Sequence, residues 1–336
     1  MYDAEAFKSA IRAFESELVR LNASKRSVPG YEICEDLKFV EPKPAYDFDL
    51  AFCDGGNYPI FTSSYFIFQL NRVFASSWKG RKRTAYVSVD FLTLTRRTNE
   101  GFSSAVYPLK ATSDIAVGDV LPSEPETVVD YRELMGLDAL TAASQLPRRI
   151  AEKKLARTLI GDHVVVLDGL LQPECQAEWN TINELRSLSQ AGNHLVAGLA
   201  KTAALLDPAL VPTTLLDREG EWYVRIARVT PRGSDLYAAK FHRAAIAPYF
   251  VEVVEGDERS IEDLFDALFS DSLDPHLPGY PHGLIDADKN ARVGMREAER
   301  LREEILRVIE PELAKGIVRG ERTLGTHDLL NALNSM

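Results

Sequence analysis

Cysteine is scarce in this chain, and long apolar runs are missing. The 336 residues include three cysteines, Cys34, Cys53 and Cys175, an odd number whose spacing fits no zinc ribbon. We therefore expect no disulfide framework, and a reducing cytoplasm is the expected location. Because the sequence has no apolar run of roughly 18 residues or more, we also expect no membrane span.

A signal-peptide pattern is also missing from the first 21 residues. Apolar residues recur there at helical spacing, which predicts an amphipathic helix that packs by one face. The residues on that face are Phe7, Ile11, Phe14, Leu18 and Leu21.

Excess positive charge is absent. The formal net charge of −11 argues against a protein that binds nucleic acid by bulk electrostatics alone. It does not exclude a nuclease, because carboxylates kept for metal ions count as negative until the metal arrives. Internal repeats and low-complexity tracts are missing too, so one elaborated domain is expected rather than a modular array. With 45% hydrophobic residues, such a domain can bury a sizeable core without a disulfide or a cofactor.

Two apolar runs end abruptly in an aspartate followed by glycine. The first is Leu50 to Cys53 before Asp54, and the second is Val164 to Leu167 before Asp168. Each run predicts a buried strand with a carboxylate at its carboxyl end, where a ligand can reach the oxygens. The pair therefore suggests a metal site, although an aspartate before glycine is also a common turn former or helix cap.

The order of the expected elements favours one of two large folds. After the strand ending at Asp54 come two β-rich stretches, 64–75 and 84–95, and this antiparallel opening is shared by ribonuclease H-like and actin-like ATPase folds. The chain then continues as helix, strand, helix and strand, which is the ribonuclease H order. We expect an α/β fold with a ribonuclease H-like mixed sheet, of antiparallel hairpins plus parallel strands, flanked by helices, with additional N- and C-terminal helices.

The other expected elements follow from periodicity and composition. They are helices over 128–160, 174–190, 261–269 and 284–309, and strands over 194–201, 222–229 and 247–254.

Two further acids stand on the apolar stripes of expected helices. Glu152 shares a stripe with Leu155, and Asp288 shares one with Leu284. A charge in such a position is costly unless something compensates it, and a metal ion can do so. Two-metal hydrolysis of phosphodiesters needs several carboxylates of this kind. Alternatively, Glu152 pairs with a neighbouring arginine, Arg148 or Arg149, and Asp288 merely suits the first turns of a helix.

Three other polar residues are weaker candidates. Lys201 closes a strand-like segment and could contact a scissile phosphate, but a lysine at a strand end is usually only solvated. His242 could also bind phosphate, although a structural histidine is the commoner case. Tyr280 lies in a Gly-Tyr-Pro turn eight positions before Asp288 and is either a site residue or an aromatic packed on the sheet.

These motifs, in this order and spacing, resemble the NurA nuclease family, the nuclease partner of the hexameric DNA translocase HerA. The resemblance covers most of the chain and uses four short motifs. They are Asp54-Gly55, Glu152, Val166-Leu167-Asp168-Gly169 and the Gly-Tyr-Pro-x-x-Leu-Ile-x-Ala segment from Gly279 to Ala287.

The resemblance implies a manganese- or magnesium-dependent deoxyribonuclease, with two ions, that acts as an exonuclease and single-strand endonuclease in DNA end resection and recombinational repair. It implies DNA, with single-stranded and duplex ends, as substrate, a HerA-type ATPase as partner, and a homodimer. Asp54, Glu152 and Asp168 would be metal ligands with Tyr280 beside them. The family usually has a histidine where this chain has Asp288, which can still ligate Mn²⁺ or Mg²⁺.

The same resemblance divides the single domain, residues 1–336, into three parts. Residues 1–47 would form a helix and linker, 48–202 the ribonuclease H-like core, and 203–336 the strands and helices that complete the site.

Two other functions remain open at this point. An actin-like ATPase or sugar kinase would use Asp54-Gly55-Gly56-Asn57 as a phosphate loop, but the chain lacks a convincing second loop, since Asp168-Gly169 is followed by bulky Leu170 and Leu171. A non-catalytic partner subunit of a DNA motor is the third possibility, because Asp288 departs from the family pattern.

Overall fold

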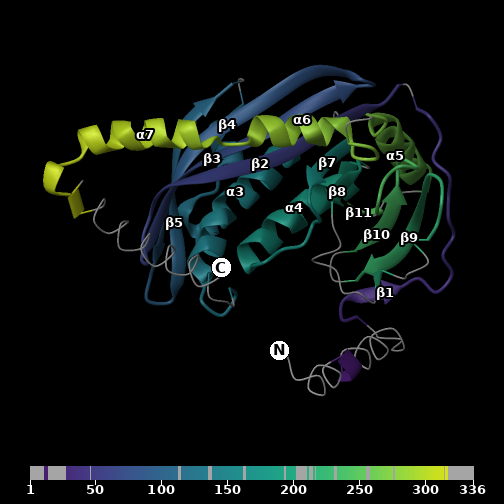
Figure 1. The fold of residues 1–336 in the computed structure, drawn as a ribbon, viewed down its shortest axis with the longest axis horizontal. Helices are drawn as coiled ribbons and strands as arrows, with labels where there is room; N and C mark the ends of the chain where they lie inside the picture. Colours follow the sequence, from purple (N-terminus) through teal and green to yellow (C-terminus); the bar gives the residue numbers. More distant parts are fainter. Residues whose placement is uncertain are drawn as a thin grey trace, which may run out of the picture.

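The computed structural model shows one large sheet with helices on both faces (Figure 1). It describes residues 11–13, 28–45, 47–112, 115–134, 138–161, 164–192, 194–201, 210–211, 215, 217–230, 233–254, 258–274, 277–313 and 315–316. Of the amphipathic helix expected over residues 1–21, residues 11–13 are described and are helical. The rest of that prediction lies outside the described residues.

The described strands form an eleven-stranded sheet in the order β1-β9-β10-β11-β8-β7-β2-β3-β4-β5-β6. Their bounds are β1 Tyr31–Ile33, β2 Asp49–Thr62, β3 Phe66–Lys79, β4 Lys82–Arg97, β5 Gly101–Ala111, β6 Val129–Asp130, β7 Val164–Asp168, β8 Val196–Ala200, β9 Trp222–Val229, β10 Ser234–Lys240 and β11 Tyr249–Val254.

The centre of the sheet has the ribonuclease H-like topology. Strands β2, β3 and β4 are antiparallel neighbours. On the other side of β2, β7 pairs with it in parallel, and β8 pairs in parallel with β7. The fold class predicted from the sequence is therefore confirmed. Strands β5 and β6 extend one edge, and β9 to β11 extend the other in antiparallel fashion.

Helices cover the sheet because successive residues of its central strands face opposite sides. Ala51 and Cys53 of β2 pack against α3 (Ala139–Arg157), while Phe52 faces α6 (His282–Ala291). Figure 1 shows this layering, with α4 (Gln176–Gly192) beside α3, and α6 running into α7 on the other side. The remaining described helical elements are α2 Val117–Val120, the 3₁₀ helix η1 Glu124–Thr127, α5 Glu258–Asp271 and α7 Met295–Val308.

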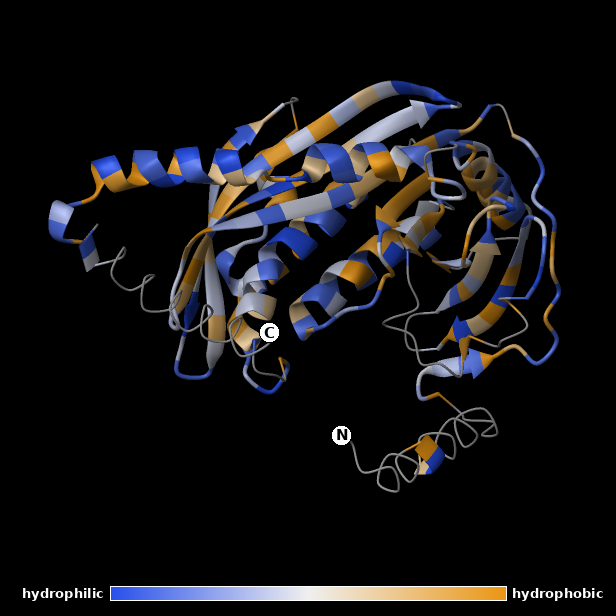
Figure 2. Ribbon diagram, in the orientation of Figure 1, coloured by the Kyte–Doolittle hydropathy of each residue, from blue (hydrophilic) through white to orange (hydrophobic). Residues whose placement is uncertain are grey.

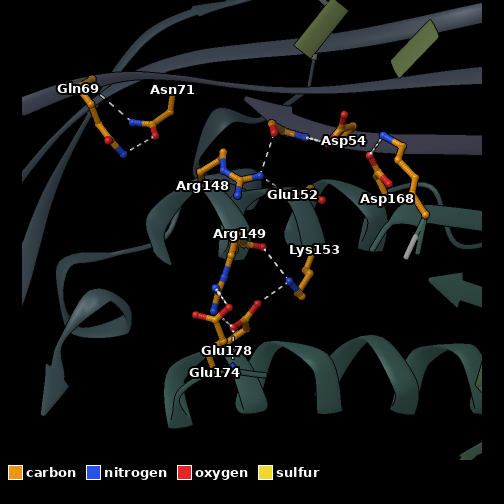
Figure 3. Close-up of polar contacts among 12 residues, drawn as sticks. Asp54, Gln69, Asn71, Arg148, Arg149, Glu152, Lys153, Asp168, Glu174 and Glu178 are labelled. Atoms are coloured by element: carbon orange, nitrogen blue, oxygen red, sulfur yellow. Dashed lines mark hydrogen bonds and ion pairs between the residues drawn. The ribbon is translucent and has the colours of Figure 1, made fainter. Parts of the chain in front are cut away.

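A buried ion-pair network joins α3 to α4 (Figure 3). Glu178 of α4 is fully buried and contacts both Arg149 and Lys153, with Lys153 Nζ 2.6 Å from its carboxylate. Burial alone would raise the pKa of Glu178, but the charges of Lys153 and Arg149 bring it below the ordinary value. Because breaking a buried pair leaves an uncompensated charge, this network holds α3 against α4.

The prediction that the first strand ends at Asp54 is wrong. Strand β2 continues to Thr62, so Asp54 lies within it. Its parallel pairing with β7 stops at Cys53 and Leu167, whereas its antiparallel pairing with β3 continues past Asp54 as far as Thr62. The long antiparallel hairpin therefore holds the two glycines after Asp54 in an extended strand rather than in a turn.

The single long helix expected over 284–309 is two helices, α6 and α7. Between them Arg292 adopts an extended backbone (φ −62°, ψ 124°), and Val293 is buried among apolar residues of β2 and β3. Tertiary packing of one valine thus interrupts the helical pattern. Figure 2 shows hydrophilic and hydrophobic residues alternating along α7, as expected for a helix with one packed face.

Other boundaries also differ from the expectations. The helix expected over 128–160 begins only at Ala139, after η1 and the short strand β6. Strands β5 and β10 were not expected at all. The tip between β3 and β4 is a tight turn at Gly80, whose positive φ of 54° suits glycine.

Helix α6 packs unusually closely on β2, because glycine occupies the contact at each of its ends. A Cβ on Gly283 would lie 2.0 Å from the ring of Phe52, and a Cβ on Gly56 would lie 2.3 Å from the carbonyl oxygen of Ala291. The buried carboxylate of Asp271 also accepts a hydrogen bond from the backbone N–H of Gly283 (2.8 Å), which caps the helix. These three contacts fix the position of α6 above β2.

Within the residues that the structure describes, no helix combines the length and apolarity needed to cross a bilayer.

We predict that Gly283→Ala destabilises the protein. The new methyl group would overlap the buried Phe52 ring, and such overpacking typically costs about 1–3 kcal/mol. Urea denaturation measures the change. Gly118→Ala in α2 is the matched control, because no atom lies within 4 Å of its added Cβ. Equal unfolding free energies for the two variants would contradict the close packing of α6.

Candidate metal centre

Three carboxylates converge where α6 crosses the parallel strands. Oxygens of Asp54 in β2, Asp168 at the end of β7 and Asp288 in α6 all lie within 4.8 Å of one another. The strand register explains the first two. Cys53 pairs with Leu167, so Asp54 and Asp168 are the next residue on each of two adjacent parallel strands.

Both aspartates face α6 because of strand alternation. Phe52, two residues before Asp54, and Val166, two residues before Asp168, belong to the core that includes Leu284 of α6. Close packing of α6 then places Asp288 over the two strands. The register of β2 and β7 thus brings Asp54 and Asp168 together, and the packing of α6 adds Asp288.

Asp54 is the most buried member of the group, with 8% of its surface exposed. Its Oδ1 accepts a hydrogen bond from the backbone N–H of Gly55 (2.6 Å). Burial, followed by the charges of Glu152 and Asp168, raises the pKa of Asp54 from 3.8 to about 8. The ionised form of Asp54 is therefore poorly stabilised by its surroundings.

Asp168 receives a donor on each carboxylate oxygen. The hydroxyl of Tyr280 donates to Oδ1 (3.0 Å), and Lys201 Nζ donates to Oδ2 (2.9 Å). The ammonium of Lys201 also lies 4.9 Å from the ring centroid of Tyr280. Burial, together with the charge of Asp168, raises the pKa of Tyr280 far above its ordinary value, so its hydroxyl remains a donor.

Asp288 is the most exposed of the three aspartates. Its Oδ2 accepts a hydrogen bond from Nη2 of Arg292 at 2.9 Å, four residues later in the chain. Sequence reasoning missed Arg292, although the i to i+4 spacing from Asp288 was the available signal.

Glu152 approaches from the opposite face of β2, behind Gly55 (Figure 3). It is buried and lies outside the group of three carboxylates, although its charge contributes to the raised pKa of Asp54. Arg148 Nη1 donates both to Glu152 Oε2 (3.0 Å) and to the carbonyl of Gly55 (2.8 Å). Of the two arginine partners considered for Glu152, Arg148 forms the pair, and Arg149 binds Glu178 and Glu174.

The structure brings Lys201 and Tyr280 into contact with Asp168, whereas His242 lies behind Tyr280, beside Gly279. Nδ1 of His242 accepts a hydrogen bond from the backbone N–H of Ala244 (3.1 Å), and its Cβ lies against Gly279. The imidazole belongs to no group of potential ligand atoms found among the described residues. His242 therefore supports the turn that carries Tyr280.

The donor set suits a hard divalent cation. Its three side chains offer only carboxylate oxygens, the ligand type that Mg²⁺ and Mn²⁺ favour. Burial, followed by the charges of Glu152 and Asp168, raises the pKa of Asp54, and a cation beside it would favour its ionised form. Asp54, Asp168 and Asp288 therefore form a group that fits a metal ion. We call this group the three-aspartate site.

We predict that the metal-free protein loses stability as the pH rises from about 4 to about 8. In this interval unfolded Asp54 is already ionised, whereas folded Asp54 keeps its proton until its pKa of about 8. Folding therefore takes up a proton, and each increase in pH disfavours it. Asp54→Asn should flatten this slope and should be more stable than the parent protein at pH 8 without metal.

Thermal unfolding in a chelating buffer from pH 5 to pH 8.5 provides the measurement. The control is Asp36→Asn, which changes an exposed carboxylate in the segment that joins β1 to β2. The two variants should differ in slope, and parallel curves for both would show that Asp54 ionises normally.

Comparison with known proteins gives similarity in structure only. No family model matches the chain, and no curated protein sequence matches it. The NurA nuclease from Sulfolobus solfataricus is similar with a TM-score of 0.48 and 12% identity, over 90% of this chain and 96% of that one. Endonuclease V from Ciona intestinalis, in complex with DNA, has a TM-score of 0.37 and 12% identity, over 87% and 99% of the chains. Endonuclease V from Bacillus subtilis has a TM-score of 0.38 and 12% identity, over 87% and 91%.

Proposed function

We propose that this protein is a divalent-metal-dependent nuclease that hydrolyses phosphodiester bonds of DNA at the three-aspartate site. The convergence of Asp54, Asp168 and Asp288 within 4.8 Å, on the α6 side of a ribonuclease H-like sheet, is the observation that supports the proposal most strongly. Bound there, two Mn²⁺ or Mg²⁺ ions would supply an activated water and stabilise the leaving oxygen.

The chain's own residues have separate roles in this proposal. Asp54, Asp168 and Asp288 hold the ions. Glu152 contributes its negative charge from the α3 face, close to Gly55. Tyr280 fixes the orientation of Asp168 through its hydroxyl, as outer partners of metal ligands commonly do. Arg148 fixes Glu152 and the backbone at Gly55 together. Lys201 contacts the phosphate of the substrate, and His242 is a weaker candidate for the same role.

The proposed parts of the domain agree with this assignment. Asp54, Glu152 and Asp168 come from residues 48–202, whereas Tyr280 and Asp288 come from residues 203–336. Neither part contains the whole site, so both belong to one functional unit.

The resemblance of the sequence motifs to the NurA family also suggests a role for the protein in DNA repair. The protein would degrade single strands and duplex ends during end resection and recombinational repair, as a homodimer with a HerA-type translocase. The substitution of Asp288 for the usual histidine gives an all-carboxylate set, which suits oxygen-preferring ions.

Cleavage of a labelled single-stranded DNA in the presence of Mn²⁺ tests the proposal. The parent protein should cleave, and Asp54→Asn and Asp168→Asn should each lower the rate by roughly a hundredfold or more, the effect of losing one strong electrostatic contact at a transition state. The control Asp36→Asn should cleave normally. Undiminished cleavage by both site variants would overturn the assignment.

Thermal unfolding with increasing Mn²⁺ separates a nuclease from a scaffold that has lost its site. An intact site should raise the unfolding temperature with ion concentration, because the ion binds only the folded state. Asp54→Asn should remove most of this increase. A parent protein that neither cleaves DNA nor responds to Mn²⁺ would be the non-catalytic subunit.

A further inference from the structure

Two of the three clustered aspartates, and Glu152 on the opposite face of β2, each have a basic partner. Glu152 pairs with Arg148 at 3.0 Å, Asp168 with Lys201 at 2.9 Å, and Asp288 with Arg292 at 2.9 Å. Asp54 has no such partner within the described part of the chain and accepts only the backbone N–H of Gly55. Side chains of the protein itself therefore partly neutralise the clustered acids.

The three basic partners differ in how firmly they are held. The side chain of Arg148 is 15% exposed and also donates to the carbonyl of Gly55. The side chains of Lys201 and Arg292 are 47% and 72% exposed, and each donates to its aspartate alone among the hydrogen bonds of the described residues. Exposed ion pairs are weak, so Lys201 and Arg292 can leave their aspartates at low cost, whereas Arg148 cannot.

A metal ion at the three-aspartate site would compete with these two side chains. Lys201 and Arg292 donate to Oδ2 of Asp168 and to Oδ2 of Asp288, that is, to two of the carboxylates that an ion at this site would contact. A divalent ion some 2.0–2.6 Å from the same oxygens would repel an ammonium or guanidinium bound there. With an ion bound there, the side chains of Lys201 and Arg292 would therefore move away from their aspartates toward solvent.

We infer that Lys201 and Arg292 are exchangeable counter-ions. They neutralise the site when it is empty, and an entering metal ion releases them to bind the phosphates of the nucleic acid strand. This inference rests on the proposed nuclease function. The ring of Tyr280 supports Lys201 in this exchange, since a cation over an aromatic face is stabilised in more than one position.

The exchange couples the metal and the nucleic acid energetically. In the metal-free protein, a phosphate must take Lys201 and Arg292 away from their carboxylates and approach uncompensated negative charge. In the metal-bound protein, both cations are already free. Metal should therefore strengthen nucleic acid binding, and nucleic acid should strengthen metal binding by the same factor.

Isothermal titration with Mn²⁺ alone tests the first half of the inference. Lys201→Met and Arg292→Met keep most of each apolar stem and remove the competing charge. Each should bind Mn²⁺ about threefold to fivefold more tightly than the parent protein, the size expected for an exposed ion pair. Lys110→Met, at an exposed position in β5, should bind Mn²⁺ as the parent does. Unchanged or weaker binding by both site variants would overturn the inference.

Fluorescence anisotropy with a single-stranded oligonucleotide carrying cleavage-resistant phosphorothioate linkages tests the second half. Mn²⁺ should increase the affinity of the parent protein for the strand, and the double variant Lys201→Met/Arg292→Met should lose most of that increase. An equal increase in both proteins would contradict the release of the two cations.

The same titrations distinguish the two proposals. A parent protein that binds no Mn²⁺ refutes the proposed function itself. A parent protein that binds Mn²⁺ normally, together with variants that match it, refutes only the exchange of counter-ions.

Discussion

The mutual repulsion of three clustered carboxylates is the constraint that explains most of the site. At a separation of about 4 Å, two like charges repel by about 4 kcal/mol at an effective dielectric of about 20, so the fold must compensate the group of Asp54, Asp168 and Asp288. Lys201 and Arg292 pair with Asp168 and Asp288. The pKa of Asp54 is raised to about 8, first by burial and then by the charges of Glu152 and Asp168. In the proposed function, a bound divalent ion would offset the repulsion that remains.

Rigid packing around the site is what maintains this unfavourable arrangement. The buried ion pairs of Glu178 fix α3 against α4, and the contacts of Gly56 and Gly283 press α6 onto β2. The three aspartates thus lie on one helix and two central strands, whose packing prevents the carboxylates from moving apart. The basic residues that move in our account lie at the exposed side of the same site.

The sequence predicted the parts of this arrangement that have short-range signals. Asp54 and Asp168 follow apolar runs, the Gly-Tyr-Pro turn indicated Tyr280, and the apolar stripe shared with Leu284 indicated Asp288. It could not predict what depends on tertiary contacts. The break between α6 and α7 arises because Val293 packs against β2 and β3. The outer strand β5 was missed because it contains Pro108 and two serines, which are uncommon inside strands. Arg292 was missed because exposed i to i+4 pairs are common on helices. The position of Glu152 on the opposite face of β2 could not be predicted, because it depends on α3 packing against the face toward which Gly55 points.

The most direct measurement is the anomalous diffraction of a crystal of this protein soaked in Mn²⁺. Our account predicts a peak within about 2.0–2.4 Å of carboxylate oxygens of Asp54, Asp168 and Asp288. It also predicts that Lys201 and Arg292 have moved off their aspartates. A crystal saturated with Mn²⁺ that shows no peak between these three residues, whether or not a peak lies elsewhere on the molecule, would contradict the account.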